Sequence, residues 1–361
     1  MSESMALVGL DVHEAQTVAA VFDPLSGELR VERLRGEPDR VVPVLLAELE
    51  RPVRAVYEAG PTGFALARAA NKCGLDVRVV APGSIPKAPG DRVKTDRRDA
   101  KRLVRLFAAG ELSFAFVPSE TDEYFRDLVR CVEDARKDLM RARHRLSKFL
   151  LRRGVRFPCS AWTQPHEQWL RSLSFDDVLS QATFIDYLSA VQGLTQRRRA
   201  LICVLEEAAP NSSHAQVVAR LRCFRGIDTL TAAGLCAEVG DFRRFAKPPL
   251  LSGFLGVVPS EYTSDSKRVQ GQITKAGPTH PRRLLVEAAH HYRRRPALGA
   301  GLKRRQDGQD PRVVQIAWRA QRRLHQRWMH LGQRRGKSSG TVAIACAREL
   351  AAFCWEAATL D

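Results

Sequence analysis

The chain has 361 residues, enough for two domains, and its 44% hydrophobic content is ordinary for a globular protein. Lys and Arg number 58 against 40 Asp and Glu, a formal charge of +18, which favours a polyanionic partner such as nucleic acid over a small neutral ligand. An acidic membrane surface is the rival partner.

The N-terminus does not have basic residues followed by a long apolar run, and no apolar stretch is long enough to cross a bilayer. We therefore expect no membrane partner and a cytoplasmic, nucleoid-associated protein. Its eight cysteines lack the two-residue spacing of zinc or redox motifs, which indicates reduced core thiols.

The first domain, residues 1–115, is predicted to begin with three strands and to continue with alternating helices and strands. The hydrophobic periodicity predicts strands at 6–12, 17–22, 28–34, 53–57 and 76–80, and helices at 39–49, 62–72 and 96–109. Composition alone would support only an α/β class. The order of the elements is that of ribonuclease-H-like (RuvC-like) folds.

The second segment, residues 116–214, is predicted to be helical and coiled-coil-like. From Phe125 to Phe149, apolar residues keep an unbroken three-four alternation, which is typical of a heptad seam. A weaker seam runs from Phe184 to Leu205 and is interrupted by Arg198. Two such helices pair either with each other or with a second chain, and the sequence leaves both possibilities open.

The third segment, residues 215–361, is predicted to be mainly α-helical. Residues 221–240 have the helix, glycine turn and small-residue helix of a helix-hairpin-helix unit, which presents backbone amides to DNA phosphate. A loop through Gly277 follows, and then a strongly basic region. On a helix predicted at 313–331, Arg319, Arg322 and Arg323 lie off the apolar stripe, which indicates either nucleic-acid contact or a solvated cationic face.

Four acids stand at the ends of predicted elements. Asp11 lies near the end of the first strand, Glu58 directly follows the fourth strand, and Asp96 and Asp99 share a face at a helix start. Each has an ordinary explanation when it is considered alone: a solvent-facing strand end, a loop Glu, or helix capping by Thr95 or Asp96.

Together the four acids predict a metal centre. The fold brings these element ends together, and carboxylate oxygens without a His or Cys cluster suit Mg²⁺ or Mn²⁺. Two such ions can activate the attacking oxygen and stabilise the leaving oxygen at a phosphodiester.

The chain resembles the insertion-sequence transposases of the "one-ten" family, which combine a RuvC-like DEDD domain with a C-terminal serine domain and are bridge-RNA-guided recombinases. The resemblance covers nearly the whole chain. It rests on GLDVH, YEAGPTG and VKTDRRDAKRL, and then on GIDTLTAAGLCAEVGDFRRF, GVVPSEYTSDSKRVQGQITKAGPTHPRRLLVEAA and VAIACARELAAFCW.

The resemblance implies that Asp11, Glu58, Asp96 and Asp99 bind the metal and that a serine attacks DNA. Ser264 is the first choice for this serine and Ser260 the second. Asp265 and Pro278 depart from the family, which usually carries Ser-Gly and Gly-Asn at these places. A polar loop hydroxyl is the ordinary alternative for either serine. The basic residues expected to hold the DNA backbone are Lys267, Arg268, Lys275, Arg282 and Arg283.

The resemblance also implies three kinds of partner. These are DNA (element ends and target), a structured guide RNA, and further copies of the chain in a dimer or tetramer in which one chain's serine meets another chain's carboxylates. A RuvC-like nuclease or junction resolvase that uses water is the main alternative. A nucleic-acid-binding protein without chemistry and an actin-like kinase or ATPase are weaker ones, because all four acids are present and a second phosphate loop is missing.

Overall fold

The computed structural model describes residues 5–49, 52–86, 95–264 and 267–361, without the side chains of Ser84, Thr263, Ser264, Lys267 and Arg268. The chain forms two compact units, residues 1–119 and residues 120–361, and each is described by itself.

The first unit is built on a mixed sheet of five strands among the described residues, in the order β3-β2-β1-β4-β5. β1, β2 and β3 are antiparallel neighbours, whereas β4 and β5 run parallel to β1. This arrangement fits a RuvC-like domain, and the α/β expectation is confirmed. The elements are β1 (Ala6–Val12), β2 (Gln16–Phe22), β3 (Leu29–Arg35), α1 (Pro38–Ala47), β4 (Val53–Glu58), α2 (Ala65–Lys72), β5 (Asp76–Val80), the 3-10 turn η1 (Pro82–Ser84) and α3 (Asp96–Ala108).

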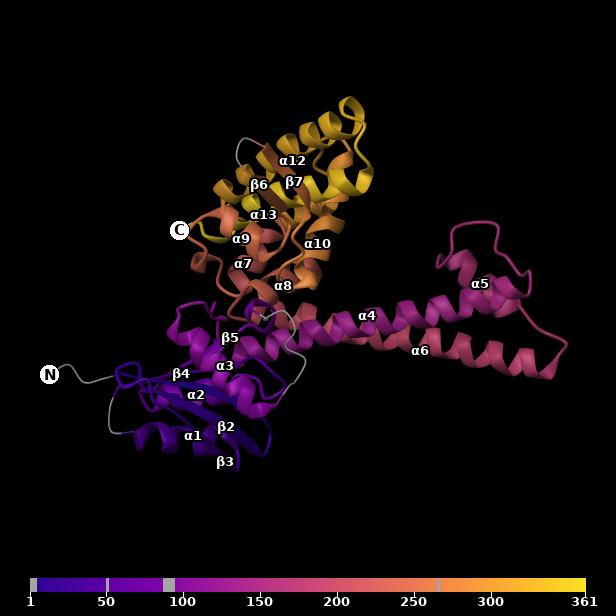
Figure 1. Cartoon of the computed structure of the whole chain (residues 1–361). Coiled ribbons are helices and arrows are strands. Elements are labelled where there is room, and N and C mark those ends of the chain that lie inside the picture. The colour runs from indigo at the N-terminus through magenta and orange to yellow at the C-terminus, as the bar shows by residue number, and fades with distance from the viewer. Residues whose placement is uncertain (1–4, 50–51, 87–94, 265–266) are drawn as a thin grey trace. The chain divides into compact units, whose positions relative to one another are not determined.

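Helices cover both faces of this sheet (Figure 1). Alternate strand residues point to opposite faces, so one face presents Leu10 and Tyr57 to α1 and α2. The other face presents Val18, Ala20 and Val56 to α3. The sheet is therefore the middle layer of three, and any group on its α3 face lies between β-strands and that helix.

The second unit is helical apart from one β-hairpin in its described part. Its helices are α4 (Glu120–Arg152), α5 (Gln164–Ser172), α6 (Val178–Ala208), α7 (Ala215–Leu221), α8 (Thr229–Val239), α9 (Pro248–Phe254), α10 (Thr279–Ala289), α11 (Ala300–Gln306), α12 (Pro311–Met329) and α13 (Ser339–Ala358). Shorter 3-10 turns are η2 (Ala209–Asn211), η3 (Phe242–Arg244) and η4 (His290–Arg293), and η5 (His330–Arg334) is a π-helical turn.

Helices α4 and α6 lie side by side along much of their length, joined through α5 at one end (Figure 1). Leu139, Leu146 and Phe149 of α4 form a buried cluster with Phe184 and Val191 of α6. The two seams of the sequence thus pair within the chain, while supercoiling of the pair stays a prediction.

The C-terminal helices share a larger core in which α13 is central. Its residues Cys346, Leu350 and Cys354 are buried, and α13 packs against α7, α9, α10 and α12. The helix-turn-helix of α7 and α8 is part of this core: Phe224 and Ile227 of its turn are fully buried. The turn therefore serves packing, and its phosphate-binding role stays a prediction.

The segment expected to be a loop through Gly277 instead begins with a β-hairpin of β6 (Pro259–Ser264) and β7 (Lys267–Ile273). That expectation was wrong because the strands are mostly polar and exposed, so they lack the buried apolar alternation by which strands are recognised.

Half of the eight cysteines, Cys223, Cys236, Cys346 and Cys354, are buried as expected, whereas Cys73, Cys159 and Cys203 are exposed. No helix within the described residues is long and apolar enough to cross a membrane.

Candidate active site

Asp11 and Glu58 lie at the same edge of the sheet. β1 and β4 are parallel neighbours with Leu10 opposite Tyr57, and the two acids are the next residues on each strand. Because Leu10 and Tyr57 face α1 and α2, the alternation of strand side chains turns Asp11 and Glu58 toward the α3 face. Two distant parts of the sequence thus deliver carboxylates to one corner.

Gly9 allows α3 to approach that corner closely. A Cβ atom on Gly9 would lie 2.5 Å from the carbonyl oxygen of Ala100 and 2.6 Å from the backbone nitrogen of Val104. Both of these atoms belong to the backbone of α3, so no side-chain rotation could relieve the overlap. The missing side chain at position 9 therefore sets the distance between β1 and the helix that carries the other two acids.

The start of α3 leaves both of its acids available. The Thr95 hydroxyl caps the helix by accepting a hydrogen bond from the Arg98 amide at 3.3 Å. Asp96 and Asp99 then occupy the first turn without serving as the cap, so the capping alternative applies to Thr95 alone. The positive end of the helix dipole favours negative charge here.

His13 links two of the acids. Its Nε2 atom lies 3.4 Å from Oδ2 of Asp11 and 3.6 Å from Oδ1 of Asp96. On the other side of Asp96, the Gln16 side-chain amide donates a hydrogen bond of 3.4 Å to Oδ2. Asp11, His13 and Asp96 are close enough to offer three ligand atoms to one ion.

The charges around Asp11 reveal an excess of negative potential. Burial raises the pKa of the Asp11 carboxyl, the nearby Asp96 and Asp99 carboxylates raise it further, and His13 lowers it in part. A cation placed among these acids would relieve that repulsion. The same three acids therefore form a site that gains more from a bound cation than isolated surface acids would.

A small hollow joins Asp11 and Asp99 to Glu58. Its volume is about 40 Å³, and Arg102 and Leu103 of α3 complete its wall. The carboxylates that line it are hard oxygen donors, and one of them, Asp11, also belongs to the group with His13 and Asp96. The residues present fit Mg²⁺ or Mn²⁺, with Asp11, Glu58, Asp96 and Asp99 as the expected ligands.

The two candidate serines both belong to β6. The backbone of Ser264 ends this strand opposite Lys267, and its side chain lies outside the described atoms, as do those of Lys267 and Arg268. Ser260 is half-buried beside Gly271 of β7. A Cβ atom added at Gly271 would lie 2.4 Å from the Ser260 hydroxyl oxygen. The hairpin thus presents two serines, and the choice between them stays a prediction.

Comparisons with known proteins find transposase families that match both the region with the four acids and the region with the two serines. A DEDD transposase model of the IS110 type, described as "Transposase", matches residues 8–153, and a model described as "Transposase IS116/IS110/IS902 family" matches residues 218–301. A Sinorhizobium fredii protein whose name describes a transposase is 40% identical over 97% of this chain and 87% of its own length. The transposase for insertion sequence element IS1533 of Leptospira borgpetersenii is 33% identical over 91% of this chain and 97% of its own.

The chain belongs to the IS110 family of transposases. It is accordingly an insertion-sequence transposase, an enzyme that cuts and rejoins DNA.

Several of the transposase's basic residues expected at DNA have partners within the protein. The Arg282 guanidinium donates to the carbonyls of Leu255 and Ala276, both at 2.9 Å, and is buried. These contacts tie α10 to the loop before it, so Arg282 has a structural role. Other arginines pair with acids: Arg283 with Glu133 and Glu287, Arg319 with Glu356, and Arg323 with Glu349.

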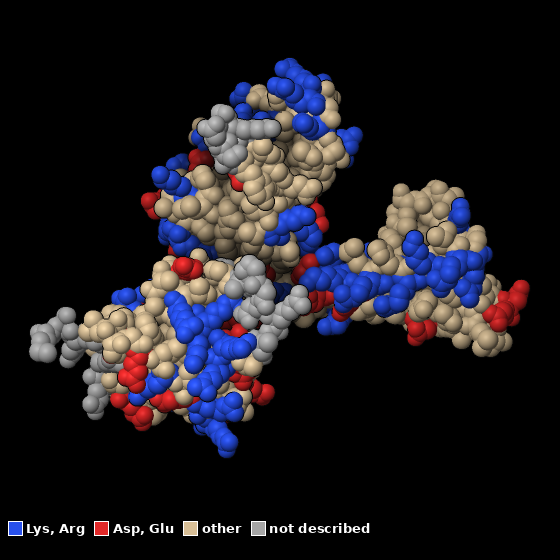
Figure 2. All heavy atoms as spheres, in the orientation of Figure 1, with Lys and Arg blue, Asp and Glu red and all other residues tan. Residues whose placement is uncertain are grey.

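Two of the expected basic contacts are more accessible. Arg322 and Lys275 are exposed and have no side-chain partner within the described residues. Further basic side chains that the sequence did not single out run along the hairpin of α4 and α6, where Figure 2 shows a line of Lys and Arg.

His13 is the site residue that sequence reasoning missed. It stands in the motif GLDVH, two residues beyond Asp11, at the turn into β2. A lone exposed histidine carries no signal by itself, but its place beside a strand-end Asp was the available clue.

Proposed function

We propose that this transposase cuts and rejoins DNA through a metal-assisted serine nucleophile, with Ser264 as the first choice and Ser260 as the second. The observation that carries the proposal is the gathering of Asp11, Glu58 and Asp99 around one hollow, with Asp96 held beside Asp11 through His13. These acids come from two strands and one helix near one edge of the sheet, and a cation bound among them would serve phosphodiester chemistry.

The acids would hold Mg²⁺ or Mn²⁺. When bound, such an ion supplies positive charge that stabilises an oxygen leaving phosphorus. The protein's own contribution is placement: β1 and β4 fix Asp11 and Glu58, while the close approach of α3 at Gly9 fixes Asp96 and Asp99.

The serine would provide the covalent step. As its oxygen bonds to phosphorus, the bond from phosphorus to the leaving DNA oxygen breaks, the serine loses its proton and the leaving oxygen gains one. Attack by a DNA hydroxyl on this phosphoserine then reverses the exchange and restores a phosphodiester. No external energy source is needed, because one phosphate ester replaces another.

The partners proposed are DNA element ends, target DNA and a structured guide RNA, bound by a homo-oligomer that is a dimer or a tetramer. Lys267, Arg268, Lys275 and Arg322 are the proposed contacts to nucleic-acid backbone. A formal charge of +18 supports a large polyanionic partner. The protein would contact RNA through shape and phosphate, while base pairing selects the sequence.

The test is a denaturing gel of purified transposase incubated with labelled element-end DNA, guide RNA and Mg²⁺. We expect a covalent protein–DNA band in the wild type that disappears in Ser264→Ala. If Ser264→Ala keeps the band and Ser260→Ala loses it, the second serine is the nucleophile. A band that survives in the double variant contradicts the serine mechanism.

The alternative is a RuvC-like nuclease or junction resolvase that uses water. The carboxylate site by itself supports it equally well, because metal and acids suffice to activate water. It predicts cut DNA with no covalent band in the same experiment.

A further inference from the structure

A pocket of about 440 Å³ lies in the second unit, among η4, α12, η5 and the start of α13. This volume is within the usual range for pockets that hold small ligands or single nucleotides. Its wall includes Arg293, Arg295, Trp328, Gly332, Lys337 and Ser339. No residue that the family resemblance assigns to the chemistry belongs to it.

The cations of this pocket lack internal partners. Within the described residues, the side chains of Arg293, Arg295 and Lys337 make no hydrogen bond or ion pair, and no acid lines the pocket. Arg319 and Arg323, on the same helix α12, are paired with acids of α13. The fold thus neutralises one side of α12 and leaves three positive charges around the pocket.

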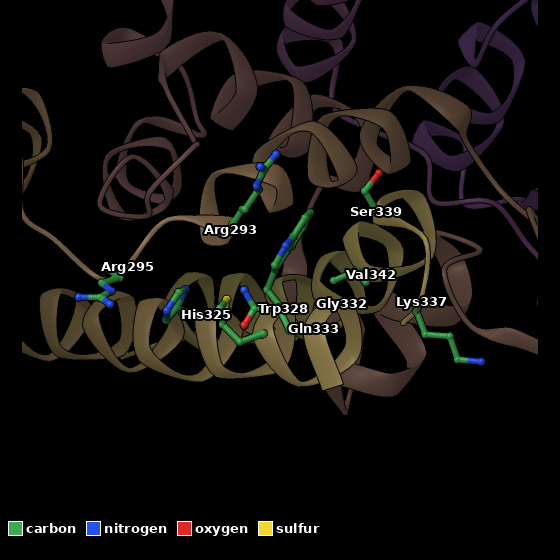
Figure 3. Close-up of a pocket in the computed structure, with 10 residues that line it drawn as sticks. Arg293, Arg295, His325, Trp328, Gly332, Gln333, Lys337, Ser339 and Val342 are labelled. Atoms are coloured by element: carbon green, nitrogen blue, oxygen red, sulfur yellow. The ribbon is translucent and has the colours of Figure 1, made fainter. Parts of the chain in front are cut away.

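The shape of the pocket places these charges around a partly apolar floor. Figure 3 shows Arg295 and Lys337 at opposite ends of the pocket in this view, with the Trp328 ring between them. Trp328 is buried and packs against the His290 ring, with 5.5 Å between the ring centroids, so the floor is held rigidly. A strand that crosses the pocket would meet cations on both sides.

A histidine and a helix start also border this cavity. The Nδ1 atom of His325 donates a hydrogen bond of 3.1 Å to the Tyr292 carbonyl oxygen, which orients the ring and leaves Nε2 of the neutral ring as an acceptor, so the phosphate-binding groups are the cations and the helix start. Ser339 stands in the first turn of the 20-residue helix α13, where Ser338 caps only the Thr341 amide. The remaining first-turn amides have no intrahelical acceptor and favour an anion.

We propose that this pocket binds the phosphate backbone of a single nucleic-acid strand, with one nucleotide seated in the cavity. Phosphate is the ligand that matches three unpaired cations and a helix start. The strand can come from RNA or from DNA, and both present the same phosphodiester. The inference rests on the proposed function only in that nucleic acid is the partner.

The first test removes charge from the pocket. The full chain is titrated, without metal, into fluorescently labelled single-stranded RNA and DNA 20-mers of one sequence, each in a series of salt concentrations. Arg293→Ala with Lys337→Ala is compared with Lys303→Ala with Arg304→Ala. The control pair removes the same charges from exposed positions of α11 that do not line the pocket.

We expect the pocket pair to weaken binding roughly tenfold or more at 0.1 M salt and to lower the salt slope by about 1.4, since each lost phosphate contact changes it by about 0.7 for single strands. The control pair should change binding much less. The strand with the larger loss identifies the natural source. Equal losses in the two pairs overturn the proposal.

The second test fills the pocket without changing charge. A Cβ atom at Gly332 meets only Val342 Cγ2, at 3.9 Å, so Gly332→Leu fits the fold and occupies the cavity; Gly301→Leu on α11 has open space and is its control. Circular dichroism confirms folding of each variant. Gly332→Leu should weaken strand binding severalfold, and wild-type affinity in this variant contradicts a seated nucleotide. The binding assay contains no cleavage step. Loss of strand binding and loss of the covalent protein–DNA band are therefore separate results, and either can occur without the other.

Discussion

Neutralising Glu238 should destabilise the second unit by an amount that depends on pH. This glutamate of α8 accepts two hydrogen bonds from the Arg130 guanidinium of α4, at 3.1 and 2.9 Å, and lies 3.5 Å from Nδ1 of His280 on α10. Its side chain is 6% exposed, so the three helices meet at a nearly buried charge. Glu238→Gln keeps the size of the side chain and removes that charge.

The magnitude follows from the pKa of Glu238. Burial by itself would raise this pKa, but the nearby His280 and Arg130 side chains outweigh it and lower the pKa from 4.5 to about 2. Each pKa unit corresponds to about 1.4 kcal/mol, so the charged carboxylate contributes about 3 kcal/mol to the free energy of unfolding. Because the folded pKa is the lower one, this contribution is complete above about pH 5 and is lost as the pH falls toward 2.

Tryptophan fluorescence during urea unfolding measures this effect selectively, because all five tryptophans lie in the second unit. The wild type should be more stable than Glu238→Gln by about 3 kcal/mol at pH 7, with the difference shrinking as the pH falls from 5 to 3. Glu356→Gln, which removes the exposed partner of Arg319, is the control and should cost less than about 1 kcal/mol. A Glu238→Gln effect that is constant from pH 7 to pH 3 would show that the charge of Glu238 does not stabilise the second unit.

Three further substitutions test the positions assigned to particular side chains. Gly9→Ala should lower Mn²⁺ affinity and the melting temperature of the first unit together, because its Cβ atom collides with the backbone of α3; an unchanged Mn²⁺ titration would contradict this. Arg282→Met should lower the free energy of unfolding by about 2 kcal/mol in urea, since two main-chain carbonyls lose the buried guanidinium that donates to them, and an unchanged unfolding midpoint would argue for a surface role. Gly271→Ala should displace Ser260 and alter hairpin amide chemical shifts, whereas unchanged shifts would place the Ser260 hydroxyl elsewhere.

The sequence predicted the first unit well because its signals are local and mutually consistent. The apolar runs of β1 and β4, the glycine after α3 and the acid spacing at Asp96 and Asp99 all lead to the same fold. The pairing of α4 with α6 was open, because a heptad seam does not name its partner, and the buried contacts of Phe149 with Phe184 resolve it.

The second unit was harder to predict because the sequence does not show whether an arginine pairs with a group inside the protein or with nucleic acid. Arg282 looks like a surface cation in a basic region, yet its guanidinium is buried against main-chain carbonyls. Arg319 and Arg323 likewise have partners on α13, about 30 residues later in the chain. The hairpin of β6 and β7 was not predicted because its strands are polar. His13 was not predicted as a site residue because only the fold brings it between Asp11 and Asp96.

The most direct test of the metal centre is a Mn²⁺ titration of the full chain followed by electron paramagnetic resonance. We predict that the wild type binds Mn²⁺ and that Asp11→Asn and Asp96→Asn each weaken binding roughly tenfold or more. Glu14→Gln, which alters an exposed acid beside His13, should bind like the wild type. Binding by Asp11→Asn and Asp96→Asn that equals that of Glu14→Gln would contradict the claim that these carboxylates form the catalytic metal site.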